Sequence, residues 1–377
     1  MYSLEIKGLL SIFLSIDKKK MSRTQAQAVQ EGQDTYTSDD VKNLQAAARQ
    51  TALRGDKLSL NFDNSGGQSI VVDPNLEVLD QFIYRPSATF LIEDAPPNVQ
   101  RALLSGLPVS ELQGVDLPLE FDARKKWPDA ITIPMEQGTC GSCWAFSTAT
   151  AISDRIRIAD PNNKELRTLI NYQPYGTRNI TYRILNNLSP YEMVYCDTCG
   201  PGNSQGCDMG CAGGFLRIAY DYVKRVGIST LLCNPPGCDP TKQKCPCTKG
   251  KDCKIYKATE SYLVFRPGDS NEVKKRKIQE DVFQFGPVTI GYKIYPSFKS
   301  FFQTNPNGVY TQQEVTQAEV AANKFEGHAV DIIGWGSQPV FHWLIRNSWS
   351  PIWAEDGHFK IQYDIVGILN ECYASKI

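Results

Sequence analysis

Two cysteines, Cys140 and Cys143, lie three positions apart in the stretch EQGTCGSCWAF (136–146). Such a pair serves as a redox couple, a metal knuckle, a disulfide, or a nucleophile beside a structural cysteine. A redox couple of the thioredoxin type needs a preceding βαβ pattern, and residues 131–136 are too short and broken for a central strand. Cys143 begins a helical pattern, where free N–H groups and the helix dipole favour a thiolate. Nucleophilic chemistry at Cys143 is therefore a candidate beside the structural interpretation.

A cysteine nucleophile needs a base and a group that orients the base. Of the three histidines, His328 directly precedes an apolar run, whereas His342 and His358 have the pattern of structural strand and turn residues. Asn347 ends the next predicted strand, and 347 − 328 = 19 residues suit two neighbouring strands joined by a turn at 336–339. This spacing predicts that Asn347 lies beside His328, although an isolated Asn there would be interpreted as a turn residue.

The elements that must position these residues are two helices followed by strands. Apolar residues at helical spacing predict a helix over 143–159, ended before Pro161, and a second helix over 215–226, ended by Gly227. Helices first and antiparallel strands later indicate an α+β chain. Strands are expected at 288–295, 329–335, 341–346 and 358–362, and short strands and turns at 81–93 and 96–108.

Composition narrows the class of protein. The chain has 377 residues with 41% hydrophobic content, enough for about two domains and a sizeable core. A net charge of -1 without a long basic run argues against nucleic-acid binding. Twelve cysteines, all between Cys140 and Cys372, indicate disulfides and an oxidising compartment. Zinc is the rival interpretation, but the irregular spacings do not match paired C-x-x-C knuckles.

The first 116 residues have a different character. Residues 8–16 are apolar but too short to span a bilayer, so a weak signal or anchor and a plain apolar segment both remain open. Residues 22–56 are polar and rich in Gln and Ala, with one expected helix at 40–53. We therefore expect 1–116 to be a pro-segment or arm. Residues 117–377 form the main domain, with 117–260 mainly helical and 261–377 mainly β.

Six motifs in order resemble the papain-like cysteine proteases, and in particular their cathepsin B branch. They are LPLEFDARKKWPD, CGSCWAF, AISDRI, GCAGG, GHAVDIIGWG and NSW, and they span roughly 117–374. The resemblance implies a two-lobed papain-like fold, with a helical lobe, an antiparallel barrel-like β lobe and the active site in the cleft between them. No cofactor or metal is expected. The implied activity is that of a cysteine endopeptidase made as a latent zymogen.

The resemblance also implies roles for individual residues. Cys143 is the nucleophile, stored as a thiolate beside protonated His328, and Asn347 holds the imidazole. Gln137 and the Cys143 backbone N–H form the oxyanion hole. Trp349 shields the His–Asn hydrogen bond, and Trp144 supports the site. The residues implied for substrate binding are Gly213, Gly214, Leu216, Gly291, Gly327 and Ala329. Small apolar walls predict an apolar P2 residue.

Three departures from the family pattern carry expectations. Ser350 and Ala354 replace glycines of the motif around Trp349, so we expect the geometry there to shift rather than fail. No histidine lies between Cys207 and Cys253, so the two-histidine anchor of the cathepsin B occluding loop is missing. We therefore expect endopeptidase activity with weak or no dipeptidyl-carboxypeptidase activity.

The resemblance implies a Cys140–Cys211 disulfide and favours Cys196–Cys253, with Cys372 unpaired. A further family bridge would join positions 130 and 157, which are Ala and Arg here. Asn179 and Asn187 are glycosylation acceptors if the chain is secreted.

The expected partners are peptide or protein substrates, the chain's own pro-segment and cystatin-type inhibitors. A monomer in a lysosomal, endosomal or secreted compartment is expected. The competing functions are an inactive binding or scaffold protein on the same fold and a thiol–disulfide oxidoreductase.

Overall fold

The computed structural model describes residues 58–61, 67–72, 87–174, 180–196, 208–236, 253–351 and 353–377. The apolar stretch at 8–16 and the helix expected at 40–53 lie outside this part of the chain. Among the described residues, no helix is long and apolar enough to cross a membrane.

A large sheet follows the order β6-β12-β7-β9-β10-β11-β8, and β3 pairs with β9 beside this path. Its neighbours are antiparallel except for β8 with β11. The four strands expected from the last third of the sequence are present as β7, β9, β10 and β11. The bounds are β3 Phe121–Asp122, β6 Glu260–Leu263, β7 Val288–Ile294, β8 Val309–Tyr310, β9 Glu326–Gly336, β10 His342–Arg346, β11 His358–Gln362 and β12 Glu371–Lys376.

The predicted helix over 143–159 is confirmed as α6 (Cys143–Ala159), and the second helix as α9 (Leu216–Arg225). The expectation of strands and turns at 96–108 is wrong. Pro97 begins helix α4 (Pro97–Leu104), because proline at the first helical positions loses no intrahelical hydrogen bond. The other helices are η2 Ile92–Asp94, α5 Ala123–Lys126, α7 Lys164–Arg167, α8 Pro190–Cys196, η3 Gly210–Ala212, α10 Asn271–Phe285, α11 Pro296–Thr304 and α12 Gln317–Ala322.

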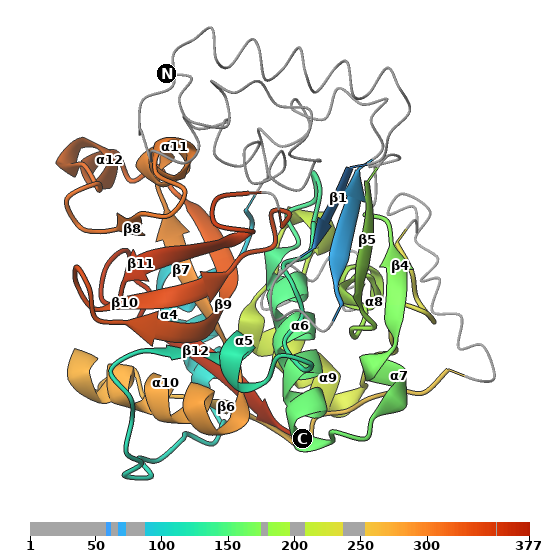
Figure 1. Cartoon of the computed structure of the whole chain (residues 1–377). Helices are drawn as coiled ribbons and strands as arrows, with labels where there is room; N and C mark the ends of the chain where they lie inside the picture. The colour runs from blue at the N-terminus through green and yellow to red at the C-terminus, as the bar shows by residue number, and fades with distance from the viewer. Residues whose placement is uncertain are drawn as a thin grey trace, which may run out of the picture.

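Helix α6 lies between two layers (Figure 1). On one side it packs against β9 of the large sheet, and on the other against α8 and α9. Its residues from Cys143 to Arg157 are all buried, which explains its weakly amphipathic sequence. The first residue of this buried helix is the candidate nucleophile, and β9 carries the candidate base. The α+β class expected from the sequence is confirmed.

A second sheet, of order β1-β2-β5-β4, combines two distant parts of the sequence. Strands β1 (Leu58–Asn61) and β2 (Ser69–Val72) come from the first 116 residues, whereas β4 (Leu169–Tyr172) and β5 (Ile180–Leu185) come from the stretch between α6 and α8. All three pairings are antiparallel. Figure 1 shows this sheet on the side of α6 away from the large sheet.

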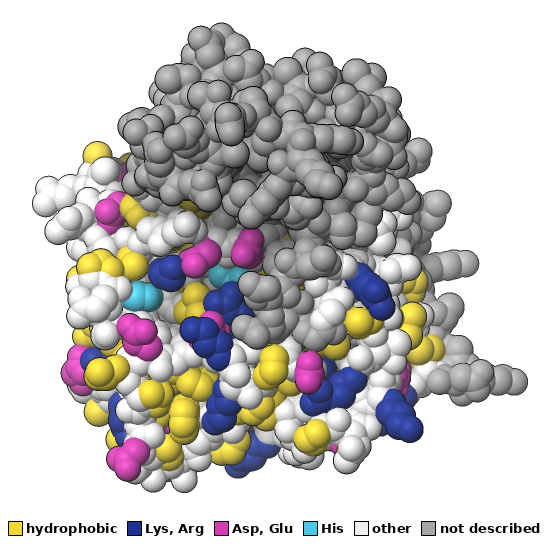
Figure 2. Space-filling model, in the orientation of Figure 1, with side chains coloured by type: hydrophobic (Ala, Val, Ile, Leu, Met, Phe, Trp, Pro, Cys, Tyr) yellow, Lys and Arg dark blue, Asp and Glu magenta, His cyan; other side chains and the backbone are white. Residues whose placement is uncertain are grey.

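The surface shows charged side chains of both signs interspersed over the face in Figure 2. This pattern agrees with the net charge of -1 and with the absence of a long basic run from the sequence.

Candidate active site

The structure brings the predicted cysteine, histidine and asparagine elements together. His328 lies on β9 and Asn347 directly follows β10, its antiparallel neighbour. The His328 Nε2 atom is 2.8 Å from Asn347 Oδ1. Because an amide oxygen only accepts, Nε2 carries the proton, and a neutral ring then leaves Nδ1 as an acceptor. Asn347 therefore fixes both the tautomer and the orientation of the imidazole.

Two tryptophans support this arrangement. The Trp349 ring stacks on His328, with ring centroids 4.7 Å apart and an interplanar angle of 29°. The Trp144 indole donates a hydrogen bond to the Gly210 carbonyl at 3.2 Å. A Cβ atom at Gly214 would lie 2.5 Å from the Trp144 ring, so only glycine fits there.

Gln137 lies in the loop that precedes α6. Its Nε2 donates to the Cys140 carbonyl at 2.9 Å, and its Oε1 accepts from the Ser348 hydroxyl at 2.6 Å. The Gln137 backbone N–H also donates to the Ser348 carbonyl. These contacts connect the loop before α6 to the residue that follows Asn347, and they fix the position of the Gln137 amide.

A segment of the first 116 residues passes directly over the candidate nucleophile and base. The Ser87 hydroxyl is 3.0 Å from His328 Nδ1, and the Thr89 hydroxyl is 3.1 Å from Cys143 Sγ. Since Nδ1 is an acceptor here, Ser87 donates to it. Each reactive atom thus has a hydroxyl of this segment as a side-chain partner. The Ser87 backbone N–H also donates to the Glu326 carboxylate at 3.0 Å.

The same segment is held by its backbone against the predicted substrate-binding glycines. The Thr89 N–H donates to the Gly327 carbonyl at 2.8 Å, and the Phe90 N–H donates to the Gly214 carbonyl at 2.9 Å. A Cβ at Gly327 would collide with the Thr89 carbonyl oxygen, and one at Gly213 would lie 2.5 Å from that of Ala88. These glycines therefore permit an extended chain to approach closely.

The remaining predicted pocket residues surround the next part of the segment. Leu216 and Ala329 are buried. A Cβ at Gly291 would lie 2.7 Å from Glu371 Oε1 and 2.9 Å from Leu91 Cδ2. The Leu91 side chain and the Glu371 carboxyl group therefore both lie beside Gly291.

Sequence analysis missed Glu371. This residue begins β12 and is 3% exposed, and its Oε1 accepts a hydrogen bond from the Ile92 N–H at 3.4 Å. Burial raises the pKa of Glu371 to about 8, and the neighbouring Glu93 and Asp94 also raise it. A single glutamate in NECYAS gives no signal of its own, because its position next to Gly291 depends on the β12–β7 pairing.

Burial controls the protonation of the reactive pair. It raises the pKa of Cys143 above its ordinary value, partly offset by the Thr89 hydrogen bond, and lowers the pKa of His328 to about 3. With the segment in place, the favoured state is a neutral thiol beside a neutral imidazole rather than an ion pair.

A buried arginine that sequence analysis also missed connects the three elements of the site. Arg346, next to Asn347, donates to Asp331 of β9 at 2.7 Å and to Asp154 of α6 at 2.5 Å. Asp154 also pairs with Arg157, whose Nε donates to the Ala130 carbonyl at 2.6 Å. Positions 130 and 157, at which the resemblance implies a disulfide in other family members, are therefore joined by a hydrogen bond here.

Ser350 and Ala354, which replace family glycines, both have left-handed backbone, with φ of 82° and 48°. Glycine adopts such angles without strain, whereas other residues are destabilised there by about 1 kcal/mol or more. The Ser350 hydroxyl lies 3.1 Å from the Tyr182 hydroxyl, so the serine makes a contact that glycine lacks.

The disulfides require one correction. Cys140 is bonded to Cys211, the pair that the resemblance implies. Cys253 is bonded to Cys233, so the pairing of Cys196 with Cys253 is wrong, although Cys196 is itself disulfide-bonded. Spacing alone does not determine connectivity. Cys143 and Cys372 are free and buried.

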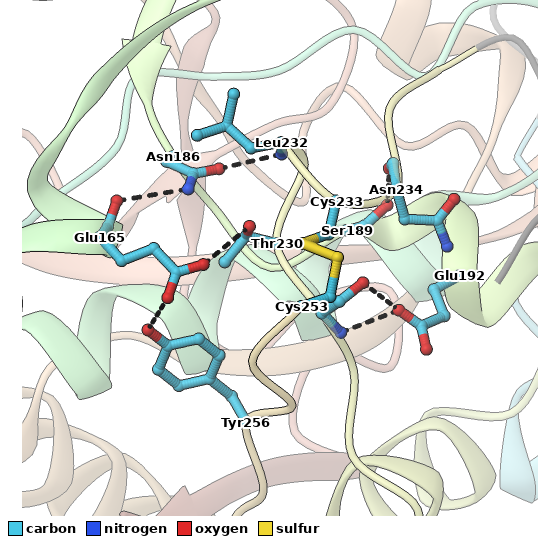
Figure 3. The surroundings of a disulfide bond; sticks show 11 residues. Glu165, Asn186, Ser189, Glu192, Thr230, Leu232, Cys233, Asn234, Cys253 and Tyr256 are labelled. Atoms are coloured by element: carbon cyan, nitrogen blue, oxygen red, sulfur yellow. Dashed lines mark hydrogen bonds between the residues drawn. A yellow bond between two sulfur atoms is a disulfide. The ribbon is translucent and has the colours of Figure 1, made fainter. Parts of the chain in front are cut away.

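Figure 3 shows the Cys233–Cys253 bond beside hydrogen-bonded polar residues that come from separate parts of the chain. Glu165 accepts hydrogen bonds from Thr230 at 3.2 Å and from Tyr256 at 2.8 Å, and Glu192 accepts from the Ser229 hydroxyl at 2.6 Å. Because the disulfide joins Cys233 to Cys253, it holds together the two ends of the cysteine-rich stretch between them.

The prediction that Asn187 is a glycosylation acceptor is also wrong. Its side chain is fully buried, donating to Thr132 at 2.9 Å and accepting from Arg157 at 2.8 Å. Asn179 lies outside the described residues.

Comparisons with known proteins agree with this geometry. The model of the papain family cysteine proteases matches residues 117–169 and 176–376. A cathepsin B-like cysteine proteinase of Schistosoma japonicum is 31% identical over 273 residues, covering 66% of this chain and 69% of that protein. Cathepsin B-like CP3 of Giardia intestinalis is 30% identical over 277 residues, covering 71% of this chain and 75% of the relative.

A solved structure shares the fold. It is proCathepsin B S9 from Trypanosoma congolense, which aligns with a TM-score of 0.55 and 23% identity over 77% of this chain and 86% of its own. The fold, the family model and the relatives agree with one another. The chain therefore belongs to the papain family of cysteine proteases, with cathepsin B-like relatives.

Proposed function

We propose that this protease hydrolyses peptide bonds with Cys143 as nucleophile and His328 as its proton partner. The observation that carries the proposal is the His328–Asn347 hydrogen bond of 2.8 Å, which turns Nδ1 toward the segment that covers Cys143. A correctly held tautomer is what a cysteine nucleophile requires of its base.

The proposed reaction has two halves. Once the covering segment has left, the Cys143 proton moves to His328 Nδ1, and the thiolate attacks the carbonyl carbon of the substrate. His328 then gives its proton to the leaving amine as the peptide C–N bond breaks, which leaves an acyl group on Sγ. In the second half, His328 takes a proton from water, the resulting hydroxide attacks the acyl carbon, and the thiolate leaves.

The oxyanion of each intermediate would be stabilised by Gln137 Nε2 and the Cys143 backbone N–H. Gln137 suits this task because Ser348 and Cys140 already fix its amide, and preorganised donors cost no rearrangement during the reaction.

We also propose that residues 1–116 form an inhibitory pro-segment and 117–377 the peptidase domain. The contacts of Ser87 with His328 and of Thr89 with Cys143 support this proposal, since they occupy the atoms that the reaction needs. The family model begins its match at residue 117, which agrees with the proposed boundary.

The P2 pocket is proposed to take apolar side chains and, in addition, basic ones. Leu216 and Ala329 form the apolar environment, which Leu91 of the covering segment occupies beside Gly291, and Glu371 adds a carboxyl group at its wall. Glu371→Gln should lower kcat/KM for a P2 arginine substrate at least about tenfold, because a buried charged hydrogen bond is lost, while a P2 leucine substrate stays within about threefold. Equal losses for both substrates would contradict the assignment.

Exopeptidase activity is proposed to be weak, since the sequence has no histidine between Cys207 and Cys253. The measurement compares a peptide with a free C-terminus against its amide, and a strong preference for the free acid would refute it. The disulfides suggest that the protein works in the secretory or lysosomal pathway. We also propose that cystatin-type inhibitors bind this protease and that it is a monomer.

An epoxide inhibitor selective for papain-like proteases tests the proposal against its alternatives. We expect covalent labelling of Cys143 together with loss of peptide hydrolysis. Ligand binding without labelling would favour an inactive scaffold protein. Insulin reduction that requires both Cys140 and Cys143 would favour an oxidoreductase, but the Cys140–Cys211 bond already occupies the sulfur that such chemistry would need beside Cys143.

A further inference from the structure

The stretch between α6 and α8 has no role in the reaction, yet it forms a well-packed hairpin. Strands β4 and β5 pair from Leu169↔Leu185 to Tyr172↔Tyr182. Residues 170–175 fall outside the match to the family model. The hairpin packs on the chain before α6 through a small apolar cluster formed by Ile133, Met135, Phe146, Ile170, Tyr172, Tyr182, Ile184, Tyr191 and Leu231.

The edge of this hairpin at β5 is occupied by the N-terminal segment. Strand β5 has β4 on one side and β2 on the other, with register from Ser69↔Arg183 to Val72↔Ile180. Strand β1 then pairs with β2. Half of the four-stranded sheet therefore belongs to the proposed pro-segment, and the other half to the peptidase domain. Addition of a strand to an exposed edge is a recurrent mode of peptide recognition.

One side chain adds specificity to this pairing. Gln68, just before β2, is 1% exposed. Its Nε2 donates to the Ile131 carbonyl at 3.1 Å, and its Oε1 accepts from the Thr132 hydroxyl at 3.1 Å and from the N–H groups of Ile133 and Leu185, both at 3.2 Å. All four partners belong to the peptidase domain. Three of them lie in the chain that leads from α5 to the catalytic loop, shortly before Gln137.

We propose that the β4–β5 hairpin is a docking site for an extended strand preceded by a glutamine, and that β2 (Ser69–Val72) of this chain, with Gln68 before it, is its occupant. This inference rests on the proposed pro-segment function and deepens it. The contacts of the segment then include one over the reactive pair and a separate one on the hairpin. Two linked contacts raise the effective concentration of each, so the hairpin contact keeps the segment near the cleft when the cleft contact opens.

Hydrogen exchange in the full chain tests the proposal, with Cys143→Ala as background so that the chain does not process itself. Gln68→Ala should accelerate exchange of the Ile180–Leu185 amides at least about tenfold, because the edge strand opens more often. The amides of Thr89, Phe90 and Gly214 should change less than about twofold. Gln100→Ala is the matched control, since the Gln100 amide donates to Glu93 and Ala95 of its own segment.

Unchanged exchange at Ile180–Leu185 in Gln68→Ala would overturn the proposal, and so would equal acceleration at both contacts. If Gln68→Ala does not fold, Gln68→Asn provides the same comparison with a shorter amide. A synthetic peptide of residues 58–72 gives a second readout, because it should bind processed enzyme whose thiol is capped, and its Gln68→Ala form should not. Failure of Ser87→Ala/Thr89→Ala to affect latency would count against the pro-segment function alone.

Discussion

The N-terminal segment contacts the peptidase domain in two contrasting ways. Over the cleft, residues 87–94 place hydroxyl groups on Cys143 and His328 and run along the substrate-binding glycines. On the hairpin, residues 67–72 use a strand edge and one buried glutamine, Gln68. Its hydrogen bonds to Ile131, Thr132, Ile133 and Leu185 involve none of the proposed catalytic residues. The cleft contact therefore involves the same atoms as the proposed reaction, whereas the hairpin contact involves neither Cys143 nor His328.

The largest expected difference between the two contacts is their response to pH. Burial under the segment lowers the pKa of His328 to about 3 from 6.5, so opening takes up a proton between these values and acid favours opening. Burial raises the pKa of Glu371 to about 8 from 4.5, so between these values the carboxyl is protonated in the closed form and loses its proton on opening. Rising pH therefore favours opening. Between pH 4.5 and 6.5, His328 takes up one proton on opening and Glu371 releases one, so the opening equilibrium does not depend on pH.

Closure over the cleft should accordingly be tightest between pH 4.5 and 6.5. The measurement is the rate of Cys143 labelling in the full chain divided by that in processed enzyme at the same pH. This ratio should rise up to about tenfold per pH unit on either side. Glu371→Gln should abolish the alkaline rise and extend the acid rise up to pH 6.5, because nothing then offsets the proton that His328 takes up. A ratio independent of pH would contradict this account.

Removal of the two hydroxyls should have the next largest effect. In Ser87→Ala/Thr89→Ala, each lost hydrogen bond is worth about 1 kcal/mol, so labelling of Cys143 in the full chain should accelerate roughly tenfold to thirtyfold. Exchange at β5 should not change. The matched control is Ser105→Ala, whose hydroxyl bonds within its own segment, to Ala102. Equal effects in both variants would show that the contacts do not mask the thiol.

Loss of an ion pair at the edge of the cleft contact should have a smaller effect. Lys293 lies 3.0 Å from both Glu93 and Asp94, and these groups are partly exposed. Partly exposed pairs contribute up to about 1 kcal/mol and are screened by salt. Lys293→Met should accelerate labelling about threefold at low salt and less at high salt, and an effect independent of salt would exclude this ionic origin.

The smallest effect is expected at an exposed pair outside both contacts. Arg266 and Glu111 lie 2.6 Å apart, with side chains 55% and 64% exposed. Such a pair contributes little, so Glu111→Gln should change the labelling rate less than about twofold. A larger change would mean that this part of the segment also controls closure.

The sequence predicted those features that depend on local pattern. The 143–159 helix and the strands with His328 and Asn347 follow from apolar periodicity, and the family motifs identified the residues around them. Residues 96–108 were expected to form short strands and turns, but Pro97 begins a helix. The Cys196–Cys253 pairing was wrong because Cys253 bonds to Cys233.

Features that depend on long-range packing could not be predicted. Ser87 and Thr89 meet His328 and Cys143 across 241 and 54 residues, and Arg346 reaches Asp154 across 192. Glu371 reaches the pocket only through its pairing in the large sheet. Ser87, Thr89 and Glu371 have no local pattern that distinguishes them from ordinary surface residues.

The central claim is that Cys143 is the nucleophile. Its most direct test uses Cys143 and Cys372, the two cysteines that are free and buried in the described part of the chain. Peptide hydrolysis by processed enzyme should fall at least about a thousandfold in Cys143→Ala, since removal of a nucleophile leaves only binding and oxyanion stabilisation. Cys372→Ala, the matched control, should retain activity within about threefold of the unaltered protein. Hydrolysis that survives in Cys143→Ala, or that disappears only in Cys372→Ala, would contradict the account.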